Sequence, residues 1–354
     1  MIRVLVVDDS AVVRAILKRE LDAERDIEVV GVAEDAYDAR EQILRIAPDV
    51  ITLDVEMPRM NGIDFLERLM MYHPLPVVIF SSVTAPNSEA ALQALSFGAV
   101  EVVAKPGVGS DARLAMQQLV RGIRAAAAAN LRHEPDDGAD SRPDMPRMNP
   151  ALRARIRQNL IAIGASTGGP AAIERLLAAM PAGSPPILIV QHMPPGFTDA
   201  FARRLDARSA MNVREARDGD RVEPDVALIA PGDRHMTVVR RGDELRVALH
   251  DGPPVHHARP SVDVLFHSIA KTVGPEAVGV LLTGMGSDGA VGMRTMRDTG
   301  AHTIAQDEKS CVVFSMPEEA IRRGGACDVL PLAHIPAAAL NAATSILLGE
   351  VSGA

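Results

Sequence analysis

Five polar side chains in the first third of the chain have the types and spacing needed to bind a metal ion and a phosphoryl group. Asp8 and Asp9 follow one apolar run directly, and Asp54 ends another. Three carboxylates gathered at one place repel one another unless a hard cation shares them, and oxygen ligands completed by water are typical of Mg²⁺. Ser81 and Lys105 follow two later apolar runs and would add a hydroxyl and a positive charge. The set predicts a site where an aspartate oxygen attacks a phosphoryl group while the metal screens the charge.

A second set of residues could carry out nucleophilic hydrolysis. Ser166 lies among glycines between a strand-like run and a helix opening at Pro170, as in a nucleophile elbow, although a plain tight turn has the same pattern. Amides at the start of such a helix can stabilise developing negative charge. His192 and Asp288 each follow a strand-like run of their own. We therefore expect a nucleophile, a base and an orienting acid at one edge of a sheet.

Spacing alone leaves the choice of base open. His267 falls in a helical stretch, and His302 begins a strand, at the end opposite to the expected site. A loop position keeps His256 and His257 as candidates. The histidines that compete with His192 are His235, His256, His257, His267 and His302.

The segment Gly284–Gly289 also fits the G-x-G-x-x-G pattern of dinucleotide-binding loops, with Asp307 after the next strand. Asp288 would then place a carboxylate inside a loop meant to hold an anionic pyrophosphate, and the unit lies late in its domain. We interpret the glycines as allowing a tight loop from which Asp288 reaches an imidazole. A dinucleotide-dependent enzyme remains the alternative.

Two stretches of alternating strand-like and helical segments must position these residues. Such alternation predicts crossover connections and parallel sheets buried on both faces, in which ligands bind beyond the carboxyl ends of the strands. We therefore expect two doubly wound, mainly parallel α/β domains, and a hairpin around Gly242. The expected sheet strands are Ile2–Val7, Ile27–Val32, Val50–Leu53, Val77–Phe80 and Val100–Val103, and then Leu160–Ala165, Ile187–Gln191, Val226–Ala230, Ala277–Leu282 and His302–Ala305.

The composition limits the function classes. With 354 residues, two domains are expected. Aromatic residues make up 3% and the net charge is −9, which argues against stacking on single-stranded nucleic acid and against binding along phosphates. No helix-turn-helix or basic patch follows the first domain, which disfavours a transcription factor. Cys311 and Cys327 lack metal-ligand spacing, and no apolar run reaches membrane-spanning or signal-peptide length, so a cytoplasmic protein is expected.

The first domain resembles the response-regulator receiver family, which has a flavodoxin-like fold. The likeness covers residues 1–122 and rests on VLVVDDS, ITLDVEMPRMNGIDFL, VVIFSS and VVAKP. It implies that Asp54 is the phosphoacceptor. The other implied roles are Mg²⁺ binding by Asp9, Asp54 and the main-chain carbonyl of Glu56 with support from Asp8, a switch hydroxyl on Ser81, and phosphoryl contact by Lys105.

The second domain, expected over residues 156–349, resembles the chemotaxis protein-glutamate methylesterase family, with a Rossmann-like fold. The motifs are IGASTGGP, VQHMPPGFT, HHARPSVDVLF, LLTGMGSDGA and TIAQDEKSCVVFSMPEEAI. The resemblance implies Ser166 as nucleophile, His192 as general base and Asp288 as its partner. It also implies the Met285 N–H as oxyanion donor, with Thr167 adjacent.

The resemblance further implies a phosphorylation-activated enzyme that removes methyl esters from chemotaxis receptor glutamates for sensory adaptation and often deamidates glutamines. The expected partners are methyl-accepting receptors as substrate and a chemotaxis histidine kinase as phosphodonor, with Mg²⁺ for phosphorylation and no cofactor for hydrolysis. Residues 123–155 lack periodic apolar residues and are rich in Pro, Asp and Arg, which predicts a flexible linker. We expect the unphosphorylated receiver to cover the edge that carries Ser166.

Overall fold

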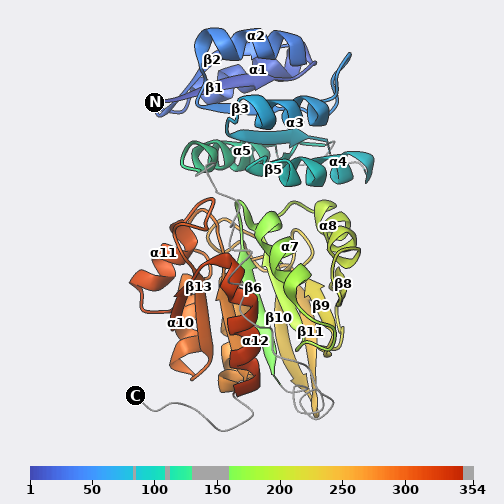
Figure 1. The fold of residues 1–354 in the computed structure, drawn as a ribbon, viewed down its shortest axis with the longest axis vertical. Helices are drawn as coiled ribbons and strands as arrows, with labels where there is room; N and C mark the ends of the chain where they lie inside the picture. The colour runs from blue at the N-terminus through green and yellow to red at the C-terminus, as the bar shows by residue number, and fades with distance from the viewer. Residues whose placement is uncertain (83–84, 108–111, 130–158, 346–354) are drawn as a thin grey trace. The chain divides into compact units, whose positions relative to one another are not determined.

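The structure, a computed structural model, describes residues 1–82, 85–107, 112–129 and 159–345 (Figure 1). The chain divides into two compact units, Met1–Arg132 and His133–Ala354, which are described separately. Both units are built from parallel strands that alternate with helices, so the predicted fold class is confirmed.

The first unit contains a parallel sheet with the strand order β2-β1-β3-β4-β5. Because β1 has β2 on one side and β3 on the other, the carboxyl ends of β1 and β3 form the switch point at which such sheets bind ligands. The elements are β1 (Ile2–Val7), α1 (Ala11–Asp22), β2 (Ile27–Ala33), α2 (Ala36–Ile46), β3 (Val50–Leu53), α3 (Gly62–Tyr72), β4 (Val77–Ser81), α4 (Ala85–Ser96), β5 (Glu101–Ala104) and α5 (Ala112–Ala127).

Burial and capping fix the turn after β1. The apolar run of β1 is packed on both faces, and Leu5 is fully buried. Ser10 then caps α1, since its hydroxyl accepts a hydrogen bond from the Val13 N–H at 3.4 Å. The two acids Asp8 and Asp9 are therefore held in a short turn at the carboxyl edge of the sheet.

The second unit contains a larger parallel sheet with the order β14-β13-β12-β6-β7-β9-β8. The chain leaves β6 for β7 on one side and later returns to β12 on the other, which puts the switch point at β6. Its strands are β6 (Leu160–Ala165), β7 (Ile187–Gln191), β8 (Asn212–Glu215), β9 (Val226–Ile229), β10 (His235–Arg241), β11 (Glu244–His250), β12 (Ala277–Leu281), β13 (His302–Gln306) and β14 (Asp328–Leu330).

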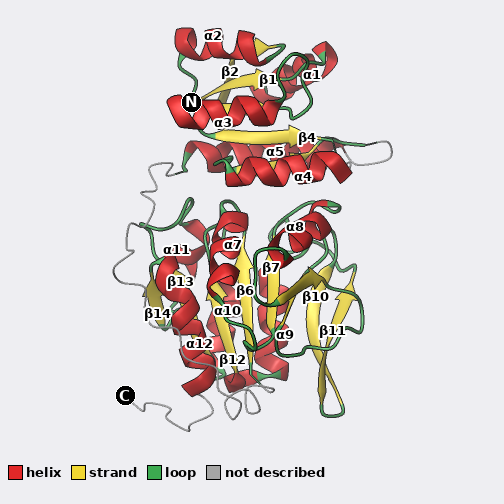
Figure 2. Ribbon diagram, turned by 45° about the vertical axis from the view of Figure 1, so that its right-hand side comes forward, coloured by secondary structure: helices red, strands yellow, loops and turns green. Residues whose placement is uncertain are grey.

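Helices cover both faces of this sheet (Figure 2). α7 contacts α8 and α12, whereas α10 contacts α9 and α11, and these two groups form the two covering layers. The antiparallel hairpin of β10 and β11 packs on α9 and turns at Gly242, as the sequence predicts. The helices are α7 (Gly169–Ala179), α8 (Phe197–Asp206), α9 (Val262–Thr272), α10 (Ala290–Asp298), α11 (Ser315–Arg322) and α12 (Ile335–Ser345), with the short 3-10 helices η2 (Gly274–Glu276) and η3 (Leu332–His334).

The predicted sheet strands are all present, each to within one residue at either end. The edge strands β8 and β14 and the helix α12 were not predicted. α5 continues to Ala127, so a first domain ending at residue 122 is too short by part of a helix. Most of the predicted linker lies outside the described residues. Among the helices that the structure describes, none is both long enough and apolar enough to cross a bilayer.

Candidate functional site

Ser166 lies in the turn between β6 and α7, and its main chain is held by three neighbours. Its N–H donates to the Thr283 carbonyl at 3.0 Å, and its own carbonyl accepts from the Gly169 N–H at 2.7 Å and from the Gln191 side-chain amide at 2.9 Å. The serine is 7% exposed. The turn is thus fixed by the strands on both sides of β6.

Two glycines allow this turn to pack closely. Gly168 has a φ of +76°, and a Cβ there would lie 2.6 Å from Val312 Cβ. A Cβ on Gly284, in the loop after β12, would lie 2.8 Å from the Cβ of Ser166. Real Cβ atoms essentially never come this close, so the approach of the β12 loop to the serine requires glycine.

His192 follows β7 and is joined both to the serine turn and to Asp288. Its N–H donates to the carbonyl of Ala165, the residue before Ser166, at 3.1 Å. Its ring Nε2 lies 2.8 Å from Asp288 Oδ2. Because an ionised carboxylate only accepts hydrogen bonds, Nε2 carries the proton in this pair. The other ring nitrogen, Nδ1, is then the atom that can accept a proton.

Asp288 is 2% exposed and is surrounded by donors. Besides His192, it accepts from the Ser261 hydroxyl at 2.8 Å, the Val262 N–H at 2.7 Å and the Asp263 N–H at 3.0 Å. Burial acts to raise the pKa of the Asp288 carboxyl, but the hydrogen bonds from His192 and from the amides outweigh burial, and the pKa lies below its usual value. Asp288 is therefore ionised at neutral pH and can stabilise an imidazolium.

The structure thus brings Ser166, His192 and Asp288 to the carboxyl ends of the adjacent strands β6, β7 and β12. Within the described residues, the Ser166 hydroxyl makes no hydrogen bond to the His192 ring. Catalytic hydrogen bonds are often long in free enzymes and shorten when substrate binds.

Two further predicted residues lie beside this site. The half-buried Met285 has a main-chain N–H that makes no hydrogen bond in the part of the chain that the structure describes, whereas the next N–H, of Gly286, donates to Ser315 Oγ at 2.7 Å. Thr167 is buried, and its carbonyl accepts from the Thr283 hydroxyl at 2.9 Å. The Met285 N–H is therefore available to an incoming oxyanion.

Four of the five competing histidines have other partners, and the fifth, His257, is exposed. Buried His235 accepts from the Ser261 N–H at Nδ1, and burial lowers its pKa. Among the histidines in the described ranges, His192 is the one whose ring is bonded to Asp288. The remaining pairs are His267 Nδ1 with the Asp263 carbonyl at 2.6 Å, His302 Nε2 with Asp328 Oδ2 at 2.8 Å, and His256 Nε2 with Asp263 Oδ2 at 3.0 Å.

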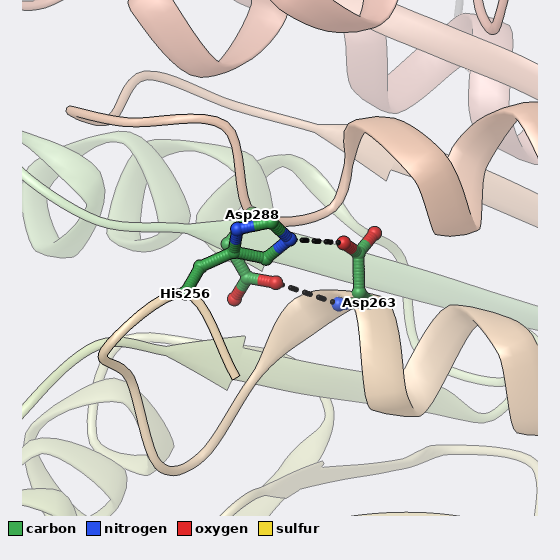
Figure 3. Close-up of side chains that lie close together, drawn as sticks. All are labelled: His256, Asp263 and Asp288. Atoms are coloured by element: carbon green, nitrogen blue, oxygen red, sulfur yellow. Dashed lines mark hydrogen bonds and ion pairs between the residues drawn. The ribbon is translucent and has the colours of Figure 1, made fainter. Parts of the chain in front are cut away.

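The sequence analysis missed Asp263, which lies beside Asp288 together with His256 (Figure 3). Burial raises the pKa of Asp263, and the charge of Asp288 raises it further. The three side chains could suggest a metal site, but each carboxylate oxygen has two acceptor positions and all four on Asp288 are occupied by donors. The Ser-x-Asp pattern from Ser261, just before a predicted helix, was the available sequence signal.

The G-x-G-x-x-G alternative is not supported by the same geometry. Asp288 lies inside this loop, is buried there and is bonded to an imidazole. Gly289, with a φ of +90°, caps α10 immediately after it. The loop is thus occupied by a carboxylate where a pyrophosphate would need amides and open space.

In the first unit, Asp54 lies at the end of β3 and is 5% exposed. Lys105 Nζ lies 2.5 Å from Asp54 Oδ2 and 2.7 Å from Asp8 Oδ2. Burial raises the pKa of Asp54, the charge of Asp8 adds to this, and Lys105 opposes it. The ionised form of Asp54 is thus destabilised by burial and by Asp8. A phosphoryl group added to Asp54 would lie next to the positive charge of Lys105.

The other predicted receiver residues lie around Asp54. Oxygens of Asp8, Asp9 and Asp54 lie within 4.8 Å of one another, an all-oxygen donor set that fits Mg²⁺. Glu56 lines one surface pocket together with Asp9. Ser81 ends β4, the strand next to β3, and is fully buried, and within the described residues its hydroxyl has no hydrogen-bond partner.

Comparison with known proteins gives matches to both units. The family model described as CheB methylesterase matches residues 161–339, and the response regulator receiver domain model matches residues 4–117. The chain is 50% identical to a protein-glutamate methylesterase/protein-glutamine glutaminase of Anaeromyxobacter dehalogenans, over 99% of this chain and 96% of the relative. It is 51% identical to the protein of that name from Escherichia coli K12, over 94% of this chain and 95% of the relative.

Among solved structures, the CheB methylesterase catalytic domain of Thermotoga maritima matches with a TM-score of 0.51 and 38% sequence identity, over 52% of this chain and 97% of that domain. The fold of the second unit and the relatives matched along nearly the whole chain agree with the resemblance seen in the motifs. The chain belongs to the CheB methylesterase family, with a response-regulator receiver domain preceding the methylesterase domain.

Proposed function

We propose that the second unit is a serine hydrolase in which Ser166 is the nucleophile, His192 the general base and Asp288 the acid that orients and stabilises the base. The reactions are hydrolysis of a glutamate methyl ester to glutamate and methanol, and of a glutamine amide to glutamate and ammonia. These are the activities named for the relatives from A. dehalogenans and E. coli, which align with 99% and 94% of this chain.

One observation carries the assignment of residues. The half-buried His192 and the buried Asp288, joined at 2.8 Å, follow strands on either side of the β6 turn that holds Ser166. A base with an orienting carboxylate beside a serine on a tight strand-to-helix turn is the arrangement that acyl transfer needs.

The reaction follows from these atoms. Ser166 Oγ attacks the ester carbonyl carbon while Nδ1 of His192 takes the hydroxyl proton, and Asp288 stabilises the imidazolium. The oxyanion of the tetrahedral intermediate accepts a hydrogen bond from the Met285 N–H, a type of contact worth roughly 10²–10³-fold in rate. Collapse releases methanol, which takes the proton from His192. Water, deprotonated by the same ring, then hydrolyses the acyl-enzyme to glutamate and free serine.

The first unit is proposed to control this reaction through phosphorylation of Asp54. Asp8, Asp9, Asp54 and the main-chain carbonyl of Glu56 would hold Mg²⁺, which neutralises charge on the phosphoryl group when bound. Lys105 would contact the phosphoryl oxygens and Ser81 would be the switch hydroxyl. The substrate would be methylated chemotaxis receptors and the phosphodonor a chemotaxis histidine kinase. Of the linker predicted over residues 123–155, the part after Ala127 stays a prediction from the sequence, as does a cytoplasmic location.

The assignment is tested by measuring methanol release from methylated receptor. Ser166→Ala should lower the rate at least about 10³-fold, because both the nucleophile and its general-base assistance are lost. The variant should still accept a phosphoryl group at Asp54. Ser209→Ala, in the same unit but bonded to the Leu177 carbonyl, serves as the control and should be unaffected. Normal turnover by Ser166→Ala would rule out the nucleophile.

A further inference from the structure

We propose that Ser261 is a positioning residue of the hydrolytic site, which acts on the reaction through Asp288. This inference rests on the proposed function of Ser166, His192 and Asp288. Ser261 precedes α9 and is fully buried, and its hydroxyl donates to Asp288 Oδ1 at 2.8 Å. Ser261 lies within the HHARPSVDVLF motif, and its contact with Asp288 exists because α9 begins next to the loop after β12.

Asp288 lies at the N-terminus of α9. It accepts hydrogen bonds there from two main-chain amides and from one side-chain hydroxyl. Two of the donors are the main-chain amides of Val262 and Asp263, which remain after any side-chain substitution except one by proline. A helix N-terminus favours negative charge, so these amides hold the carboxylate in its ionised form. The third α9 donor is the Ser261 hydroxyl. It binds Oδ1, whereas His192 binds Oδ2, so Ser261 fixes the rotation of the carboxylate that aims Oδ2 at the base.

The Ser261 hydroxyl is itself held in one orientation. Its oxygen accepts the Val264 N–H at 3.4 Å and so caps α9, which leaves its proton directed to Asp288. The Ser261 N–H donates to Nδ1 of His235 at 3.2 Å, and Nε2 of that ring is 3.0 Å from the Pro253 carbonyl. Because both the hydroxyl and the main chain of Ser261 are fixed, the Asp288 carboxylate that accepts its hydrogen bond has little freedom to rotate.

Asp263, which lies next to Asp288, makes the hydrogen bond from the Ser261 hydroxyl more important for stabilising the Asp288 carboxylate. Asp263 is 4% exposed, and its carboxylate repels that of Asp288 (Figure 3). Asp263 is held by the Gly292 N–H at 2.6 Å and by His256 at 3.0 Å. The titratable groups that face Asp288 are therefore His192, Asp263, His235 and His256, and a ring nitrogen of His256 lies within 4.8 Å of an Asp288 carboxylate oxygen. Removing the Ser261 donor leaves Asp288 more dependent on its bond to His192.

The consequence is a specific change in the pH profile. A carboxylate with fewer donors attracts the imidazolium more strongly, so the His192–Asp288 pair binds its proton at higher pH. The acid limb of kcat/KM, where the base must be deprotonated, should move upward in pH. A hydrogen bond to a charged group, when lost, typically corresponds to about ten- to hundredfold in rate, and we expect this loss in kcat with little change in KM.

The test uses two variants of the full-length chain, Ser261→Gly and Ser261→Ala. Both lack the hydroxyl, but they differ in stability. Both variants lose the hydrogen bond to the buried Asp288, but glycine is a better N-cap than alanine, so Ser261→Ala should unfold more easily than Ser261→Gly. Both should show the same loss of kcat and the same upward shift of the acid limb. Ser268→Ala removes another α9 hydroxyl, one that binds the Leu265 carbonyl, and should leave kcat and the acid limb unchanged.

Wild-type kcat and an unshifted acid limb in Ser261→Gly would overturn the proposal. So would a kcat loss that follows stability, with Ser261→Ala far worse than Ser261→Gly. Asp288→Asn separates this from failure of the proposed triad: if that variant hydrolyses normally, the triad is wrong. If Asp288→Asn is impaired and Ser261→Gly is normal, the triad stands and the positioning role alone fails.

Discussion

At the scale of one residue, the buried carboxylate of Asp54 lowers the stability of the first unit at neutral pH. Burial and the charge of Asp8 raise its pKa, and Lys105 compensates only in part. For an acid whose pKa is raised in the folded state, the unfolded chain gives up its proton first as pH rises. The stability that this group contributes is therefore highest at acid pH and is lost as pH rises toward the folded pKa.

Asp54→Asn should consequently block phosphoryl incorporation and also stabilise the first unit at neutral pH. Lys105 keeps an ion pair at 2.7 Å with Asp8 in this variant. We expect an increase in Tm of a few degrees, measured by calorimetry at pH 7 and absent at pH 3. Asp64→Asn, an exposed acid on α3, is the control. An unchanged or lower Tm for Asp54→Asn at pH 7 would contradict the raised pKa.

At the scale of elements, the loop after β12 positions the serine as well as the acid. Gly284→Ala would bring a Cβ to 2.8 Å from Ser166 Cβ and against the Met316 sulfur. Displacing a nucleophile by about 1 Å can reduce the rate on the order of 10²-fold, so kcat should fall by about this factor while the unit stays folded.

Gly279→Ala, on β12 itself, is the matched control for Gly284→Ala. Its Cβ would lie 3.1 Å from the Met296 sulfur, so it also crowds a methionine, but away from the serine. The Tm should fall for both variants, and further for Gly284→Ala because its Cβ clash is closer, but methanol release per folded molecule should fall for Gly284→Ala alone. Equal rates would show that the β12 loop does not position Ser166.

The sequence predicted elements whose signal is local. Continuous apolar runs such as Leu160–Ala165 mark central strands, and Ser166, His192 and Asp288 could be placed because each follows such a run. β8 and β14 are short edge strands that are only partly buried, so they lack an apolar run. Ser261 and Asp263 were missed because their role arises from contact with a residue about 25 positions away. The choice of His192 among rivals required the family resemblance.

At the scale of the whole molecule, one chain joins a phosphorylation site to a hydrolytic site. We expect acetyl phosphate with Mg²⁺ to raise methanol release by the full chain, and Asp54→Asn to abolish this response. A chain lacking residues 1–150 should have a higher basal rate and no response, as expected if the unphosphorylated receiver inhibits. The solved relative from T. maritima is a catalytic domain by itself, which supports folding of the truncated chain.

Methanol release per folded molecule, with folding checked by thermal unfolding, distinguishes the outcomes. A truncated chain that is folded but slower than the full chain would argue against inhibition by the receiver. A response to acetyl phosphate that survives in Asp54→Asn would show that another residue accepts the phosphoryl group.

The main-chain bonds of Ser166 and His192 have a consequence for how the enzyme can be controlled. The Ser166 N–H is bonded to the loop after β12, and the His192 N–H to the end of β6. Both amides should exchange with deuterium as slowly as those of the central strands, because neither is released until the sheet itself opens. Distorting this site would thus require breaking the most protected part of the unit. A signal acts at far lower free-energy cost by admitting or excluding substrate.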